Sequence, residues 1–136
     1  MLRLSKKVEY SLMALLHMDD VPQGDCVSAK EMAEQHQIPP ELLGKVLQAL
    51  ARAGLTEAVL GARGGYRLQQ PLAKLTLGDV LTAVDGPLQL VKCQDNPEAC
   101  DHYQTCTIRQ PVNDMQRQLA DYIQAFRLDR LKRKTA

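Results

Sequence analysis

The sequence predicts a mainly α-helical fold with one small β-hairpin. Three observations lead to this prediction: two short helical segments joined by a proline turn, a glycine-rich hairpin pattern directly after them, and a long amphipathic segment near the C-terminus. The chain has 136 residues, of which 45% are apolar and 24% are charged. This composition is ordinary for a globular protein and suits one compact domain or one small domain with an appendage.

An N-terminal helix is expected from about Ser5 to Met18. Its apolar residues recur at helical spacing, at Val8, Leu12, Leu15 and Leu16. The segment from Val21 to Asp25 contains a proline and a glycine, and it ends the helical pattern.

A helix-turn-helix is expected next. Ser28 and Glu31 have the spacing of a capping box, which begins a short helix that runs to His36. Pro40 suits the first position of a second helix, which buries Leu42, Leu43, Val46, Leu47 and Leu50. Gly54 stands where a left-handed C-terminal cap is needed. Two short helices joined by a tight turn are typical of a helix-turn-helix.

The hairpin follows at once. Leu55 to Leu60 and Tyr66 to Leu68 are expected to be two short strands around the glycine-rich tip from Gly61 to Gly65. A hairpin directly after a helix-turn-helix is the wing of a winged helix. Residues 1–70 are therefore interpreted as a winged helix-turn-helix DNA-binding domain; two stacked helices and a hairpin without a DNA role are the alternative.

Residues 71–136 are interpreted as a second part of the chain. Thr76 to Asp79 caps a helix that stops at Gly86, and Pro111 opens a long final helix. Apolar residues follow that helix at steps of three and four, at Val112, Met115, Leu119, Tyr122 and Phe126. They form a seam that favours a two-fold homodimer over packing on its own domain. The basic segment from Arg127 to Lys134 is expected to be a solvated end.

A cysteine loop, from about Leu90 to Gln110, separates these two helices and lacks any periodicity. It holds Cys93, Cys100 and Cys106, spaced more widely than the paired cysteines of structural zinc sites. Soft thiolates on a flexible loop suit an iron–sulfur cluster, and three of them leave one iron position for a weaker ligand. Zinc and three ordinary thiols are the alternatives. Cys26 stands apart and is interpreted as an ordinary thiol.

Charge and motifs exclude several classes of protein. The net charge of +1 excludes a histone-like polycation, and no apolar run is long enough for a membrane helix. Glu9 and His17 interrupt the resemblance of the N-terminus to a signal peptide, so a cytoplasmic protein is expected. An enzyme is not expected: the glycine-rich tip lacks the Lys-Ser/Thr of a phosphate loop, and none of the histidines pairs with a plausible nucleophile.

The ordered set of motifs resembles a known family, the dimeric winged-helix iron–sulfur transcription regulators that include IscR, NsrR and RirA. The resemblance spans nearly the whole chain. It rests on Leu2 to Lys6, Tyr10, Ala14, Leu15, Ile38, Pro39, Leu42, Leu43, Leu47, the run from Arg63 to Leu68, and the three-cysteine loop after Asp85-Gly86-Pro87. It implies a DNA-binding winged helix, a cluster loop and a long C-terminal dimerisation helix.

The resemblance also implies the cluster ligands, which would be Cys93, Cys100 and Cys106. IscR-like members place a histidine three residues after the last cysteine, but this chain has Arg109 there, which cannot ligate. NsrR-like members use an acidic side chain of the partner's first helix, and Glu9 occupies that position. His102 is a second candidate. Both a [4Fe–4S] and a [2Fe–2S] cluster remain open.

On this interpretation the helix from Pro40 to Arg52 enters the major groove of DNA. Lys45 is the first candidate for a base or phosphate contact, with Glu41 as an acceptor for cytosine. Arg63 at the wing tip suits the minor groove. The complete set of expected DNA-binding residues is Ser5, Lys6, Lys7, Ser28, Pro40, Glu41, Lys45, Arg63 and Arg67. Because residues 1–70 have no net charge, affinity has to come from local placement of bases.

The expected function is that of a cluster-dependent DNA-binding transcriptional repressor that senses NO, redox state or iron status. It would bind a double-stranded operator as a homodimer, away from any membrane. A regulator that uses a thiol–disulfide switch or zinc is the first alternative, and an iron–sulfur carrier or scaffold is the second.

Overall fold

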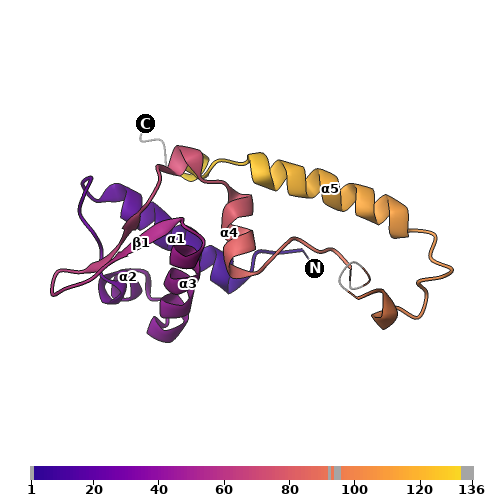
Figure 1. Ribbon diagram of the computed structural model, residues 1–136, viewed down its shortest axis with the longest axis horizontal. Helices are drawn as coiled ribbons and strands as arrows, with labels where there is room; N and C mark the ends of the chain where they lie inside the picture. The colour runs from indigo at the N-terminus through magenta and orange to yellow at the C-terminus, as the bar shows by residue number, and fades with distance from the viewer. Residues whose placement is uncertain (1, 92, 94–95, 133–136) are drawn as a thin grey trace.

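The structure is a computed structural model that describes residues 2–91, 93 and 96–132. It confirms a mainly helical chain with one small two-stranded antiparallel sheet. The elements are α1 (Lys6–Asp20), α2 (Ala29–His36), α3 (Pro40–Arg52), β1 (Thr56–Val59), β2 (Gly65–Leu68), α4 (Leu77–Val84) and α5 (Arg109–Ala125). The molecule is elongated: the hairpin lies at one end of the long axis and the cysteine loop at the other (Figure 1).

Helix α1 begins where the sequence predicts, because the Ser5 hydroxyl accepts a hydrogen bond from the backbone N–H of Val8 at 3.2 Å. Its buried face is rotated from the predicted one. Val8 and Leu15 are buried as expected, but Leu12 and Leu16 are only half-buried. Ser11, Ala14 and Met18 complete the buried face. The small buried Ser11 donates to the carbonyl of Lys7 at 2.6 Å, so its hydroxyl is satisfied within the helix.

The helix-turn-helix is present, with two corrections. The Ser28 hydroxyl caps α2 by accepting from the N–H of Glu31 at 3.0 Å, but only this half of the predicted capping box forms. The complete reciprocal box is at the start of α4, between Thr76 and Asp79. Pro40 is the first residue of α3, as predicted. Leu43, Val46, Leu47 and Leu50 are buried, whereas Leu42 lies at the edge of the buried face.

The hairpin pairs β1 with β2, from Thr56 opposite Leu68 to Val59 opposite Gly65. It packs against the loop between α1 and α2, because Val27 and Tyr66 exchange backbone hydrogen bonds of 2.9 and 2.8 Å. A Cβ atom at Gly65 would lie 2.2 Å from the carbonyl oxygen of Val27. Only glycine permits this approach of the two backbones.

One hydrophobic core unites α1 to α4 with the segment after α5. Its buried members are Val8, Ala14, Leu15, Met18, Val27, Met32, Ala33, Ile38, Leu43, Val46, Leu47, Leu50, Leu55, Leu72, Leu75, Val80 and Leu128. The core therefore continues past residue 70 and includes a side chain from beyond α5.

The prediction of a solvated, frayed end is half right for residues 127–132: Arg127, Arg130 and Lys132 are exposed, but the segment is anchored to the core. Leu128 is 1% exposed, and its N–H donates to the carbonyl of Leu75 at 2.9 Å. Lys132 forms an ion pair of 2.5 Å with Asp19 of α1. The segment returns to the core because Leu128 can bury its apolar surface there. The rest of the predicted basic end, residues 133 and 134, lies outside the described residues.

Helix α5 begins at Arg109, two residues before Pro111. The predicted start was wrong because proline is tolerated throughout the first turn, where no backbone N–H has an intrahelical partner. Every residue of α5 is described, and none is buried. On the predicted seam, Met115 is 48% exposed and Tyr122 is 61% exposed, while Phe126 lies just beyond the helix. The helix packs against α4 and extends away from it (Figure 1).

The C-terminal end of α5 is anchored to α4. Gln124 donates to the Thr76 hydroxyl at 3.0 Å and to the Asp79 carboxylate at 3.1 Å. The carbonyl of Phe126 accepts from the N–H of Leu77 at 2.9 Å. Within the described residues, no helix has both the length and the apolar character that crossing a membrane requires.

Candidate nucleic-acid interface and cysteine loop

A polar face runs along α3, opposite its buried leucines. It consists of Glu41, Lys45, Gln48 and Arg52, all exposed and spaced by four, three and four residues. This spacing places them on one side of the helix. Pro40 is also exposed at the start of α3. The α3 polar face therefore presents one central cation flanked by groups that can accept or donate hydrogen bonds.

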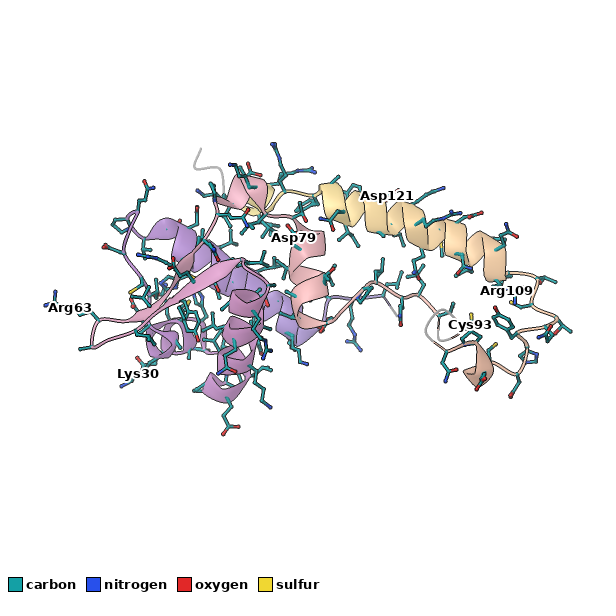
Figure 2. The ribbon with its side chains drawn as sticks, viewed as in Figure 1. Lys30, Arg63, Asp79, Cys93, Arg109 and Asp121 are labelled. Atoms are coloured by element: carbon teal, nitrogen blue, oxygen red, sulfur yellow. The ribbon has the colours of Figure 1, made fainter. Side chains whose placement is uncertain are left out.

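The two arginines of the hairpin differ in their surroundings. Arg63 is exposed at the tip and points away from the rest of the molecule (Figure 2). Arg67 lies on β2, where its guanidinium pairs with Glu57 at 3.1 Å and donates to the carbonyl of Gly24 at 3.4 Å. The charge of Arg67 is therefore already offset, whereas Arg63 extends into solvent. The Cys26 thiol, half-buried, donates to the carbonyl of Arg63 at 3.0 Å.

The start of α1 holds three of the predicted DNA-binding residues, and two of them are engaged within the chain. The Ser5 hydroxyl donates to the carboxylate of Asp85 at 2.6 Å while it caps α1. Lys6 pairs with Glu9 at 3.1 Å, and the hydrogen bond and charge of Glu9 raise the pKa of Lys6. Lys7 is exposed. The bond from Ser5 to Asp85 is the link that sequence reasoning missed, because the two residues are 80 positions apart.

The cysteine loop contains a short 3-10 turn over Pro97–Ala99, and Cys93 also has 3-10 geometry. The thiols of Cys93, Cys100 and Cys106 are free and half-buried. Among the described residues, no three His, Cys, Asp or Glu side chains gather around a point that could hold one metal ion. His102 is exposed, and Glu9 is bound to Lys6. The structure thus places three thiols on one loop without bringing them together.

Arg109 stands where the loop meets α5. Its guanidinium donates to the carbonyl of Tyr103 at 2.8 Å and stacks on the Tyr103 ring, with the guanidinium carbon 4.1 Å from the ring centroid. Figure 2 shows Arg109 and Cys93 at the same end of the molecule, far from Arg63.

A pair of histidines joins α1 to α2 on the winged-helix side. His17 Nδ1 and His36 Nε2 are 2.9 Å apart, and the two rings meet edge to face. Burial lowers the pKa of the His36 imidazole, and the charge of His17 lowers it further. This pair lies outside the predicted DNA-binding and cluster residues.

A family model described as "Rrf2: Iron-dependent Transcriptional regulator" matches residues 4–134. The chain belongs to the Rrf2 family. The family resemblance expected from the sequence is thereby confirmed, and this Rrf2 chain is a DNA-binding transcription regulator. Rrf2 regulators are commonly dimeric.

Solved structures of other regulators have the same fold. CymR, the global cysteine regulator of B. subtilis, matches with a TM-score of 0.71 at 21% identity, covering 96% of this chain and 96% of that chain. CymR of Staphylococcus aureus matches with a TM-score of 0.71 at 25% identity, covering 97% and 99%. IscR of T. potens matches with a TM-score of 0.72 at 19% identity, covering 99% and 94%.

Proposed function

We propose that this Rrf2 chain is a cytoplasmic transcriptional repressor whose affinity for operator DNA depends on an iron–sulfur cluster. The observation that carries the proposal is the placement of three free, half-buried thiols on one loop, in a chain whose family model is described as iron-dependent. Residues 1–70 would read DNA, and residues 71–136 would hold the cluster and the dimer contact.

The donor set fits such a cluster chemically. Cys93, Cys100 and Cys106 offer three soft thiolate ligands from a loop with little regular structure, so the loop can close around a group larger than one metal ion. Glu9 of the partner subunit would be the fourth ligand, and its carboxylate would leave the ion pair with Lys6 to bind iron. His102 is the alternative fourth ligand. When bound, the cluster supplies an iron with one non-thiolate ligand, where NO or O2 can act.

The DNA contacts follow from exposure and charge. Lys45, at the centre of the α3 polar face, would reach a base edge or phosphate in the major groove, with Glu41 beside it. Arg63 would enter the minor groove from the wing tip. Lys7 is exposed for phosphate contact, and Ser5 and Lys6 would first release Asp85 and Glu9. Ser28, Pro40 and Arg67 complete the proposed interface.

The seam on α5 supports a homodimer. Met115 and Tyr122 are exposed on it, and Val112 and Leu119 are only half-buried. A second copy of α5 would bury these side chains and generate the two-fold symmetry of an operator whose half-sites are about one helical turn apart. If Glu9 ligates across this dimer, cluster assembly joins one subunit's loop to the other subunit's α1. A coupling of about 1–3 kcal/mol is typical of such switches.

Anaerobic purification, followed by an absorption spectrum and iron and sulfide analysis per monomer, tests the proposal. The wild type should bind iron and acid-labile sulfide, Cys100→Ala should lose both, and Glu9→Ala should hold the cluster more weakly. Cys26→Ala is the matched control, because its thiol lies at the wing rather than in the cysteine loop. A wild-type protein without sulfide after anaerobic reconstitution would overturn the cluster proposal.

A cluster-free regulator that uses zinc or a thiol–disulfide switch is the second candidate. It is compatible with three free, half-buried thiols on one loop, since such thiols can ligate zinc or be oxidised as well as ligate a cluster. Metal analysis of the sulfide-free protein, together with thiol counts under oxidising conditions, distinguishes zinc from a disulfide.

A further inference from the structure

Arg109 holds the irregular segment between Cys100 and Cys106 through a single residue, Tyr103. One guanidinium nitrogen donates to the Tyr103 carbonyl at 2.8 Å, and the guanidinium plane covers the Tyr103 ring at 4.1 Å. A backbone hydrogen bond and a cation–π contact to the same residue fix both its main chain and its side chain. The segment contains backbone hydrogen bonds of turns, from Tyr103 to Cys100 and from Thr105 to His102.

The same side chain lines two cavities, each of which is also lined by one of the three cysteines. It lines a cavity of about 630 Å³ onto which Cys93 opens, together with Tyr103 and Arg117. It also lines a second cavity of about 480 Å³ onto which Cys106 opens. A permanent positive charge therefore borders the space beside both thiols.

One acid, Asp114, lines both cavities beside Arg109, but its carboxylate is paired with Arg117. Within the part of the chain that the structure describes, no carboxylate pairs with Arg109, whereas Arg117 on the same helix pairs with Asp114. The N-terminus of α5 adds to the positive potential, because its N-cap Ile108 provides no side-chain hydrogen bond and its first turn contains no acidic residue. The junction of loop and helix therefore favours a negatively charged group.

We propose that Arg109 is a positioning and charge-compensating residue of the cysteine loop. It orders the segment before Cys106 through Tyr103, and its charge stabilises the anionic assembly formed when thiolates ligate an iron–sulfur cluster. This proposal rests on the proposed function. Arg109 itself is no ligand, because a guanidinium has no free lone pair to offer a metal.

The experiment compares wild type with Arg109→Gln, Arg109→Lys and Arg117→Gln. The last is the matched control, since Arg117 lines the same cavity as Arg109 but its charge is already paired. The first readout is amide hydrogen exchange in the cluster-free protein at Tyr103 and Thr105, whose N–H groups bond to Cys100 and His102. Both substitutions of Arg109 should speed this exchange about fivefold, while Arg117→Gln should leave it unchanged.

The second readout is the rate at which the reconstituted protein loses its cluster to a chelator without oxygen. Arg109→Gln should raise this rate about tenfold, and Arg109→Lys, which keeps the charge, should stay within about threefold of wild type. Equal rates for Arg109→Gln and Arg117→Gln would overturn the role of charge. Unchanged exchange in both Arg109 variants would overturn the positioning role. If wild type takes up no cluster at all, the proposed function fails, and the exchange measurement still decides the positioning role.

Discussion

The two ends of the molecule are built differently. At the winged-helix end, α1 to α4 share a buried core, and Gly65 brings the hairpin within backbone contact of Val27. At the other end, the cysteine loop contains half-buried thiols and exposed polar residues, and Arg109 binds it at Tyr103. The difference teaches that the part expected to read DNA is held by a buried core, whereas the part expected to hold a cluster has its donors on a loop with little regular structure. Local stability should follow the same division.

The largest effect is expected where the chain after α5 joins the core of α1 to α4, the packed end of the molecule. Leu128→Ala should lower the free energy of unfolding by about 2–4 kcal/mol, because it leaves a cavity in the core. Leu131→Ala, in the same short 3-10 helix but 37% exposed, should cost less than about 1 kcal/mol. Urea denaturation of both variants measures the difference. Equal losses would mean that residues 127–132 do not belong to the core.

The close packing of the wing predicts the next effect. Gly65→Ala should destabilise the protein by roughly 2 kcal/mol, since its Cβ would meet the Val27 backbone. Gly44→Ala, in α3 where a Cβ meets nothing within 4 Å, should instead stabilise it by about 0.5–1 kcal/mol. Thermal unfolding provides both values. A tolerated alanine at position 65 would show that the hairpin is not held against the loop before α2.

The two arginines of the hairpin, Arg63 and Arg67, should differ in their contribution to DNA affinity. Arg63→Ala should weaken operator binding about fivefold and reduce its salt dependence, because an exposed cation is lost from the DNA surface. Arg67→Ala should have a smaller effect, since Glu57 already offsets that charge. Fluorescence anisotropy at several salt concentrations measures both. A larger loss of affinity for Arg67→Ala than for Arg63→Ala would mean that the hairpin does not contact DNA through its tip.

The bond from Ser5 to Asp85 joins the start of α1 to the end of α4. Asp85→Asn and Ser5→Ala should each destabilise the fold by about 1 kcal/mol, and the double variant should cost less than the sum of the two. A double-mutant cycle from urea denaturation gives the coupling energy. Additive losses would show that the two groups act independently.

The smallest effect is a pH dependence confined to the packed end. Because the pKa of His36 is lowered below its ordinary value of 6.5, the unfolded chain binds the proton more readily. His36 therefore contributes stability that is present above about pH 6.5 and is lost as the pH falls toward its lowered pKa. Denaturation at about pH 7.5 and about pH 5.5 measures this loss, which His36→Gln should reduce. A loss that persists unchanged in His36→Gln would show that another group causes it.

The packed end was largely predictable from sequence because local rules determine it. Ser5, Ser28 and Thr76 mark helix starts by the hydrogen bonds that their hydroxyls accept, and Pro40 marks one by its fixed backbone angle. Each signal depends only on residues within one turn. The winged helix-turn-helix followed from their order.

The remainder depends on contacts between distant residues. In the sequence, Leu128 is part of a basic segment. In the structure its N–H donates to the carbonyl of Leu75, and nothing in the local pattern predicts this pairing. The predicted helix start at Pro111 failed because proline marks a first turn but not its first residue. In the cysteine loop, residue identity led to the cluster proposal, but no periodicity or helix cap determines how the three thiols are arranged, so their positions could not be derived.

The anchoring of α5 gives the helix the mechanics of a beam clamped at one end. Gln124 and the carbonyl of Phe126 fix its C-terminal end to α4, while the far end meets the cysteine loop. Seventeen residues of helix span about 25 Å, so a tilt of about 10° at the clamp moves the far end by roughly 4 Å. Conversely, a displacement of the loop by a few ångströms becomes a small rotation at α4. In the proposed homodimer, a rigid α5 would convert closure of the loop around a cluster into a change of angle between the two DNA-binding winged helices.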